Sequence, residues 1–364
     1  MVKLGDVINV HYGKALKADQ RVSNGSVHVF GSSGTVGNHD KTLCSYPTII
    51  IGRKGSVGAI TWAPDGGWII DTAYYVEIKD NNKLDLRYLF YILSGIDLTK
   101  KTITTSIPGL NRDDLYDTFI KLPPFEEQKR IVDLLDKAEG IRQKREQAIK
   151  LADDFLRAKF LEMFGTPANN IHRFPKGTIR DLVDSVNYGT SAKASIDSGE
   201  YPILRMGNIT YQGRWDFTDL KYLDLSVKEK DKYLVKEGDL LFNRTNSKEL
   251  VGKTAVYEED RPMAFAGYLI RVRPNSIGNN YYISGYLNSI HGKITLMNMC
   301  KSIVGMANIN AQELQNIEIL IPPKHLQDEY EIIYKKIKKG LSIYDKSAMQ
   351  LQLLASNLSN KYFM

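Results

Sequence analysis

The sequence predicts an α/β (α+β) chain in which two strand-rich domains form a tandem repeat, each followed by a long helix. The stretch LPPFEEQKRI (122–131) recurs as IPPKHLQDEY (321–330), with the Pro-Pro and a Gln kept in both copies. Before each copy, Val, Ile, Tyr and Thr alternate with turn clusters, which is typical of short strands. After each copy comes a charged segment with helical periodicity. These observations predict the order domain, helix, domain, helix.

The two halves of the chain correspond along their length, which indicates an internal repeat. The matching blocks, in order, are VINVHYGK with DSVNYGTS; TIIIGRKGSVGAITWAPD (48–65) with DLLFNRTNSKELVGKTAVYEED (239–260); and TTSIPGLNRDDLYDTFIKLPP (104–124) with CKSIVGMANINAQELQNIEILIPP (300–323). We therefore expect one domain at 1–122 and the other at 165–321. Each should contain a helix, near Leu84–Ile96 in the first and Tyr282–His291 in the second.

The segments that follow the domains have the apolar spacing of long helices. In both, apolar residues alternate at spacings of three and four, beginning at Ile131 and at Ile333. This alternation is the seam of a coiled coil, and Gly165 is a stop signal for the first helix. Because each seam needs a partner along its length, we expect the helices at 123–164 and 322–364 to pack against each other.

Composition indicates a soluble globular protein, since the 364 residues are 43% hydrophobic and 25% charged. The sequence contains neither an apolar run of roughly 18 residues nor a signal-peptide pattern, so we expect a cytoplasmic protein without a membrane partner. Cys44 and Cys300 belong to no C-x-x-C pair, and the histidines show no ligand spacing, so we expect no metal site. The net charge of +7 is compatible with DNA binding but does not require it.

Two stretches of the sequence resemble motifs of enzymes, but each lacks a residue or a structural context that the enzyme needs. The Pro-Pro motif resembles the Asn/Asp-Pro-Pro-aromatic loop of DNA amino-methyltransferases, but Leu122 and Ile321 replace the residue that accepts hydrogen bonds from the target amine. No Phe-x-Gly-x-Gly cofactor loop precedes it. SKELVGKT (247–254) resembles a phosphate-binding loop without its first glycine, yet a strand-like run follows it where a helix would have to begin. We expect neither methyl transfer nor nucleotide binding by this chain.

A nuclease is the third enzymatic alternative. Pro64–Asp65 followed by Glu77–Lys79 satisfies the loose PD…ExK pattern, whose carboxylates hold Mg²⁺. The second copy of the repeat carries Arg271 and Arg273 at the matching place, so the two copies do not share the carboxylates. We therefore expect no catalytic residues in this chain.

The corresponding loops carry residues suited to DNA. Arg53 lies in GRKGSVG and Arg244 in NRTN, and Tyr12 and Tyr188 both precede a glycine. Arginine can bridge guanine O6 and N7, asparagine can bridge adenine N6 and N7, and glycines allow backbone N–H groups to approach phosphate. The candidate DNA-binding residues are Tyr12, Lys14, Ser32, Ser33, Arg53, Lys54, Ser56 and Asn111 in the first domain and Tyr188, Arg205, Asn243, Arg244, Asn246, Lys253 and Asn308 in the second.

The whole chain resembles the specificity subunit of type I restriction-modification systems. The most specific part is LPPFEEQKRIVDLLDKAEGIRQKREQAIKLADDFLRAKF, where the Pro-Pro, Gln128, Ile131 and Leu135 match the central conserved region of that family. The second copy, IPPKHLQDEYEIIYKKI, keeps the Pro-Pro and Gln327 but has Lys-His in place of Phe-Glu. The resemblance is therefore stronger for the first helix than for the second.

The resemblance implies a chain that is not an enzyme. Each strand-rich domain would be a target recognition domain that binds one half of a bipartite sequence on double-stranded DNA. The helices would pack as an antiparallel coiled coil that sets the gap between the half-sites. Two methyltransferase subunits holding S-adenosylmethionine would be partners, restriction subunits would join for cleavage, and this chain would hold no cofactor.

The helices would also dock the methyltransferase subunits. The residues expected at the helix-helix and methyltransferase-subunit interface are Ile131, Leu134, Ile141, Phe155, Ile337, Leu341, Tyr344, Leu351 and Leu358. The alternative from another class is a coiled-coil adaptor whose domains bind protein and have no DNA specificity.

Overall fold

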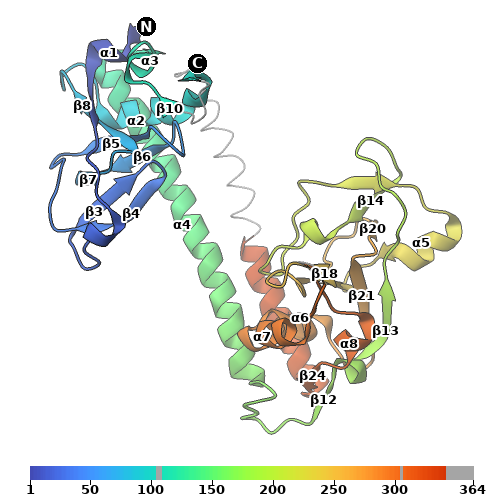
Figure 1. Ribbon diagram of the computed structural model, residues 1–364. Coiled ribbons are helices and arrows are strands. Elements are labelled where there is room, and N and C mark those ends of the chain that lie inside the picture. Colours follow the sequence, from blue (N-terminus) through green and yellow to red (C-terminus); the bar gives the residue numbers. More distant parts are fainter. Residues whose placement is uncertain (104–108, 304–305, 342–364) are drawn as a thin grey trace. The chain divides into compact units, whose positions relative to one another are not determined.

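The computed structural model describes residues 1–103, 109–303 and 306–341. These residues form two compact units, one up to Arg145 and one from Glu146 onward (Figure 1). Each unit contains one strand-rich domain, and α4 (Phe125–Phe164) continues from the first unit into the second as one helix. Helices and strands are mixed in both units, which confirms the predicted fold class.

The first unit is built on two sheets. One is an antiparallel sheet with strand order β2-β8-β5-β6, and the other has the order β4-β3-β7, in which β3 pairs with β7 in parallel. Short ladders join β1 to β11 and β9 to β10. The strands are β1 (Val2–Lys3), β2 (Ile8–Tyr12), β3 (Val27–Gly31), β4 (Gly34–His39), β5 (Thr48–Gly52), β6 (Ile60–Ala63), β7 (Trp68–Ile69), β8 (Ala73–Ile78), β9 (Thr102–Ile103), β10 (Gly109–Leu110) and β11 (Phe119–Ile120).

Helix α2 covers the core of the first unit. The helices there are α1 (Leu4–Val7), η1 (Ala18–Gln20), α2 (Leu86–Gly95), η2 (Leu98–Lys101) and α3 (Arg112–Tyr116). The side chain of Asp85 caps α2 by accepting a hydrogen bond from the backbone N–H of Tyr88, 2.8 Å away. Leu89 and Leu93 lie on one buried face of α2 and pack with the apolar strand β5. The helix predicted near Leu84–Ile96 is thus confirmed.

The second unit repeats this plan with additions. Its larger sheet has the order β13-β21-β17-β19, and a second sheet has the order β15-β14-β20-β16. The strands are β12 (Lys176–Thr178), β13 (Val183–Tyr188), β14 (Tyr201–Leu204), β15 (Lys221–Leu223), β16 (Leu234–Val235), β17 (Leu240–Asn243), β18 (Thr245–Asn246), β19 (Thr254–Val256), β20 (Met263–Phe265), β21 (Leu269–Pro274), β22 (Lys301–Ile303), β23 (Met306–Asn308) and β24 (Glu318–Leu320). The helices are η3 (Ile179–Leu182), η4 (Met206–Asn208), α5 (Val227–Tyr233), α6 (Asn280–Asn288), α7 (Ile290–Met299) and α8 (Ala311–Gln315), and a further helix occupies 324–341.

Topology confirms the tandem repeat. In the larger sheet of the second unit, β13, β21, β17 and β19 take the places of β2, β8, β5 and β6 in the first. All neighbouring strands in both sheets are antiparallel. The parallel pair β3 and β7 corresponds to β14 and β20. Helix α6 lies where the second predicted helix was expected, and it corresponds to α2.

The repeated Pro-Pro motif joins each domain to its helix through a buried glutamine. The Nε2 of Gln128 donates to the carbonyls of Lys83 (2.7 Å) and Pro123 (2.9 Å), and its Oε1 accepts from the backbone N–H of Asp85 (2.9 Å). In the second unit, the Nε2 of Gln327 donates to the carbonyls of Ile277 (2.9 Å) and Pro322 (2.8 Å). Both glutamines are fully buried. The motif therefore holds the start of each helix against the domain.

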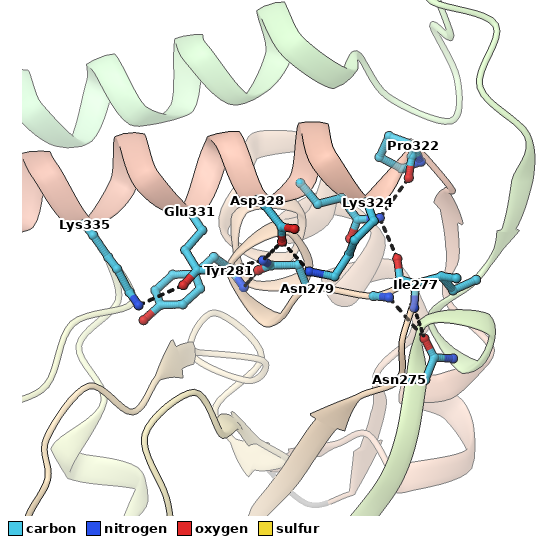
Figure 2. A network of polar contacts seen from close by, with 11 residues as sticks. Asn275, Ile277, Asn279, Tyr281, Pro322, Lys324, Asp328, Glu331 and Lys335 are labelled. Atoms are coloured by element: carbon cyan, nitrogen blue, oxygen red, sulfur yellow. Dashed lines mark hydrogen bonds and ion pairs between the residues drawn. The ribbon is translucent and has the colours of Figure 1, made fainter.

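Next to the second Pro-Pro motif, a polar network connects α6 to the helix at 324–341. Figure 2 shows Asn279, which caps α6, pointing toward Asp328 and Glu331 on that helix. Its Nδ2 donates to Asp328 (2.8 Å) and Glu331 (2.7 Å). Lys335 forms an ion pair with Glu331 (2.8 Å) and lies over the ring of Tyr281. These contacts fix the register of the helix on the second domain.

Within the second unit, the final part of α4 packs antiparallel to the helix at 324–341. The ring centroid of Phe160 lies 5.4 Å from that of Tyr330. Earlier on α4, Leu156 lines a cavity together with Tyr334 and Leu341, which come later on the partner helix. Residue numbers thus rise along one helix as they fall along the other. The predicted antiparallel packing is confirmed for this part, and the chain leaves α4 at Gly165, whose φ is 67°.

Candidate nucleic-acid interface

Both domains place a tyrosine against an arginine at the same position of the repeated sheet. Tyr12 is the last residue of β2, and Arg53 is the first residue after β5. The guanidinium carbon of Arg53 lies 5.1 Å from the ring centroid of Tyr12. Tyr188 ends β13, and Arg244, which follows β17, lies 4.9 Å from its ring. Such cation-π contacts contribute about 0.5–1 kcal/mol at exposed sites. The two tyrosines are 47% and 41% exposed, so each pair can be reached from solvent.

The glycine after each tyrosine is required by a close approach of the backbone. A Cβ on Gly13 would lie 2.1 Å from the carbonyl oxygen of Ile70, and one on Gly189 would lie 2.3 Å from that of Phe265. Any other residue would force these segments apart. The glycine of the repeated Tyr-Gly dipeptide is therefore required by the close packing of the backbone at the end of β2 and of β13. We call this place, where the tyrosine and the arginine meet, the corner of each sheet.

The two arginines are also anchored alike. The backbone N–H of Arg53 donates to Thr72 (2.9 Å) and its Nη1 to the carbonyl of Asp71 (3.3 Å). The backbone N–H of Arg244 donates to Tyr268 (3.0 Å), and its Nη1 contacts the carbonyl of Gly267 at 3.4 Å. No carboxylate of the described chain pairs with either side chain. Each guanidinium is thus oriented by the protein and keeps donors for a ligand.

The surroundings of the two tyrosines differ. Tyr12 packs edge-to-face on Tyr74, with centroids 5.0 Å apart, and Arg112 also lies over its ring, at 5.3 Å. Burial and the hydrogen bond with Tyr12 raise the pKa of Tyr74 to about 12. In the second domain, the hydroxyl of Tyr188 instead accepts a hydrogen bond from the backbone N–H of Ala311, 2.9 Å away. Neither Tyr74 nor Arg112 is among the residues predicted from sequence.

The remaining candidates of the first domain lie on the same loops or cap a nearby helix. Ser32 and Ser33 form the turn between β3 and β4, and Ser32 lies beside Gly55 of the arginine loop. Lys14 and Lys54 are exposed. The backbone N–H of Lys14 donates to the carbonyl of Ile69 at the end of β7, and that of Lys54 donates to the carbonyl of Thr72, just before β8. Two further candidates are Ser56, which is exposed in the Arg53 loop, and Asn111, whose side chain caps α3.

The second-domain candidates occupy more varied places. Asn243 is fully buried, and neither atom of its amide has a hydrogen-bond partner among the described residues. Lys253 is 8% exposed, and burial lowers its pKa. Arg205 follows β14 in the other sheet and pairs with Asp219 at 2.8 Å. The last two are Asn246, which accepts from the backbone N–H of Ser247, and Asn308, which donates to Thr245. Direct DNA contact stays a prediction for these five and for the other candidates of both domains.

The helix candidates fall into two groups. Ile131 is buried in the core of the first unit, Leu341 is buried and Ile337 half-buried, whereas Leu134, Ile141 and Phe155 are exposed. The residues of α4 that enter the core of the second domain are Phe160 and Phe164. Tyr344, Leu351 and Leu358 lie outside the described residues.

No group of His, Cys, Asp or Glu side chains in the described part of the chain is placed to hold a metal ion. Over the same residues, none of the helices has both the length and the apolar character needed to span a bilayer. The arrangement that both domains share is an oriented, half-buried arginine guanidinium beside an exposed tyrosine ring.

Curated proteins to which this chain is similar include specificity subunits. The putative type I restriction enzyme MjaX specificity subunit of Methanocaldococcus jannaschii is 32% identical over 171 residues, which are 46% of this chain and 38% of the relative. The type I restriction enzyme EcoKI specificity subunit of Escherichia coli is 24% identical over 256 residues, 66% of this chain and 54% of the relative. This chain spans about half the length of these relatives or less.

Solved structures show the same fold. A type I restriction-modification S subunit from M. genitalium aligns with a TM-score of 0.71 at 15% identity, over 100% of this chain and 95% of the other. A chain from a structure on complex assembly and conformational transition of the type I R-M system has a TM-score of 0.52 at 17% identity, over 100% and 96%. The family model for the type I restriction modification DNA specificity domain matches residues 1–151 and 174–355, one segment in each half. The chain therefore belongs to the type I restriction modification DNA specificity family.

Proposed function

We propose that this chain is the DNA sequence-specificity subunit of a type I restriction-modification complex and catalyses no reaction itself. Each recognition domain would read one half of a bipartite target on double-stranded DNA. The observation that carries the proposal is the exposed tyrosine-arginine pair, which recurs at the same corner of both sheets with different neighbours. Arginine donors suit guanine edges and phosphates, and different neighbours would select different bases.

The proposal assigns the chemistry to partner subunits. Two methyltransferase subunits holding S-adenosylmethionine would methylate adenine, and restriction subunits would cleave. The exposed apolar residues Leu134, Ile141 and Phe155 of α4 are the proposed docking points for a methyltransferase subunit. A complex that acts on genomic DNA would work in the cytoplasm.

The decisive experiment is to express the chain with the methyltransferase subunits of its own host and to map methylated adenines across a genome. A bipartite motif with a fixed gap is the expected result. The purified chain alone, supplied with S-adenosylmethionine, should methylate nothing. If no motif appears, and if duplex binding by the complex does not weaken steeply as salt rises, the chain is a protein-binding adaptor and not a DNA reader.

Replacement of either arginine tests the site itself. We expect Arg53→Ala or Arg244→Ala to weaken binding of the mapped duplex by about 1–3 kcal/mol, because each removes an oriented donor group. Fluorescence anisotropy with the assembled complex measures the loss. Lys228→Ala, which removes an exposed charge from the second domain, is the control and should have little effect. Equal, small effects of all three changes would contradict the assignment.

A further inference from the structure

The first domain holds two arginines on one tyrosine ring. The guanidinium carbons of Arg53 and Arg112 lie 5.1 and 5.3 Å from the ring centroid of Tyr12. Arg112 is the first residue of α3 and also lies 5.9 Å from the ring of Tyr116. Two cations from segments far apart in sequence are thus gathered around one exposed ring.

Arg112 has no polar partner among the described residues. No ion pair or side-chain hydrogen bond joins it to another described residue, and its Nε is buried without an acceptor. A guanidinium carries five donors and is always charged. The position of Arg112 is unfavourable in two ways: its charge is repelled by the second guanidinium, and its buried Nε–H has lost water without gaining an acceptor. An acceptor-rich anionic ligand would relieve both costs.

The second domain lacks this second arginine. The helix caps Asn111 and Asn310 correspond in the repeat, so Ala311 takes the place of Arg112. Its backbone N–H donates to the hydroxyl of Tyr188, and Arg244 is the arginine that lies over that ring. One domain therefore presents two guanidinium groups at the corner where the other presents one.

We propose that Arg112 is a further DNA-contacting residue, specific to the first recognition domain, which acts with Arg53 on one acceptor group of the duplex. That group is a phosphate or the O6 and N7 edge of a guanine, since both offer paired acceptors to a guanidinium fork. The inference rests on the proposed function, because it takes the corner around Tyr12 as the DNA-binding site. If the inference holds, binding of the first half-site depends on two arginines, and binding of the second depends on one.

The test uses the complex of the full chain with its methyltransferase subunits and a duplex carrying the mapped motif. Arg112→Met keeps an unbranched stem between the two tyrosine rings but removes the charge, and Lys83→Ala removes one exposed charge elsewhere in the same domain. We expect Arg112→Met to weaken binding roughly 5-fold to 150-fold and Lys83→Ala to change it little. Thermal unfolding of both variants checks that the domain is intact.

Arg112→Lys separates the two ligand sources and remains informative if the Met variant fails to fold. At a phosphate, lysine should preserve the salt slope, whereas Arg112→Met should lower it by about one. At a guanine, lysine should relax discrimination at one base of the first half-site. If Arg112→Lys and a folded Arg112→Met both behave like Lys83→Ala while Arg53→Ala weakens binding, the inference is wrong and the proposed function stands. If Arg53→Ala is also without effect and no motif is methylated, the proposed function itself fails.

Discussion

At the scale of single residues, the two buried glutamines show how a repeated motif acts. Gln128 satisfies two carbonyls and one backbone N–H, all from the segment before α2 or from the Pro-Pro. Gln327 satisfies two carbonyls, but its Oε1 has no partner among the described residues. A side chain that donates two hydrogen bonds is needed at both Pro-Pro motifs, because the carbonyls there are enclosed and have no regular secondary-structure partner.

Replacing Gln128 should destabilise the first unit. Gln128→Leu preserves volume but leaves the enclosed carbonyls and the N–H of Asp85 unpaired, at an expected cost of about 1–3 kcal/mol. Gln327→Leu should cost less, since fewer hydrogen bonds are lost. Urea unfolding followed by circular dichroism measures the free energy, with the exposed Gln147→Leu as control. A Gln128→Leu variant as stable as that control would show that the joint contributes nothing.

Lys293 on α7 predicts a pH dependence of stability. Burial, with the nearby Arg157 and Lys253, lowers its pKa to about 8 from 10.5. Between about pH 8 and 10.5 the unfolded chain therefore binds more protons than the folded one, and this residue makes the folded state more stable as pH rises. Below about pH 8, Lys293 is protonated in both the folded and the unfolded chain, so the free-energy cost of burying its charge no longer changes with pH.

Lys293→Met should remove this dependence. The stability of the variant should exceed that of the wild type most at pH 7–8, where only the wild type carries the buried charge. This difference in stability should shrink toward pH 10. Melting temperatures of both proteins across this range provide the comparison, and other groups that titrate there cancel in the difference. A difference that stays constant with pH would mean that Lys293 has its ordinary pKa in the folded chain.

At the scale of elements, α4 is more than one half of a coiled-coil seam. Phe155, expected at the helix-helix and methyltransferase-subunit interface, is 49% exposed, whereas Phe160, which is outside the heptad spacing, is 1% exposed. The Phe160 ring packs on Tyr282 of α6 and Tyr330 of the helix at 324–341. The end of α4 therefore belongs to the core of the second domain.

Two phenylalanines on the same helix offer a matched comparison. Phe160→Ala should destabilise the second unit by about 3–5 kcal/mol, because it opens a cavity among packed rings. Phe155→Ala should cost much less, since most of its surface stays in water. Urea unfolding of each variant gives the difference. Equal costs would mean that Phe155 is covered in the native protein.

At the scale of the whole molecule, the tandem repeat gives one chain two copies of the tyrosine-arginine pair, in domains joined by a continuous helix. The strand order of the larger sheet, the tyrosine-arginine corner and the glutamine joint all recur. Under the proposed function, the residues around each corner determine the bases read, and α4 determines the gap between half-sites. Gap length and base identity should therefore vary independently.

An insertion in α4 tests that independence. Seven residues, about two helical turns, added within Lys137–Arg157 should change the gap in the methylated motif and leave the bases of both half-sites unaltered, because a helix grows by about 1.5 Å per residue. The same insertion in the exposed loop between Asp197 and Ser198 is the control and should leave the gap unchanged. Mapping of methylated adenines reads out both. A change in the half-site bases would contradict the role of α4 as a spacer.

The sequence by itself determined the tandem repeat, the order of domains and helices, and the correspondence of Tyr12 with Tyr188 and of Arg53 with Arg244. Local periodicity and repeated motifs are enough for these, because both copies obey the same backbone constraints. Only the tertiary structure decided that each arginine lies on its tyrosine and that Arg112 joins the first pair. It also decided that Phe160, not Phe155, is buried. Such contacts join strands and helices distant in the chain, and a heptad pattern does not show which face of a helix a neighbouring domain covers.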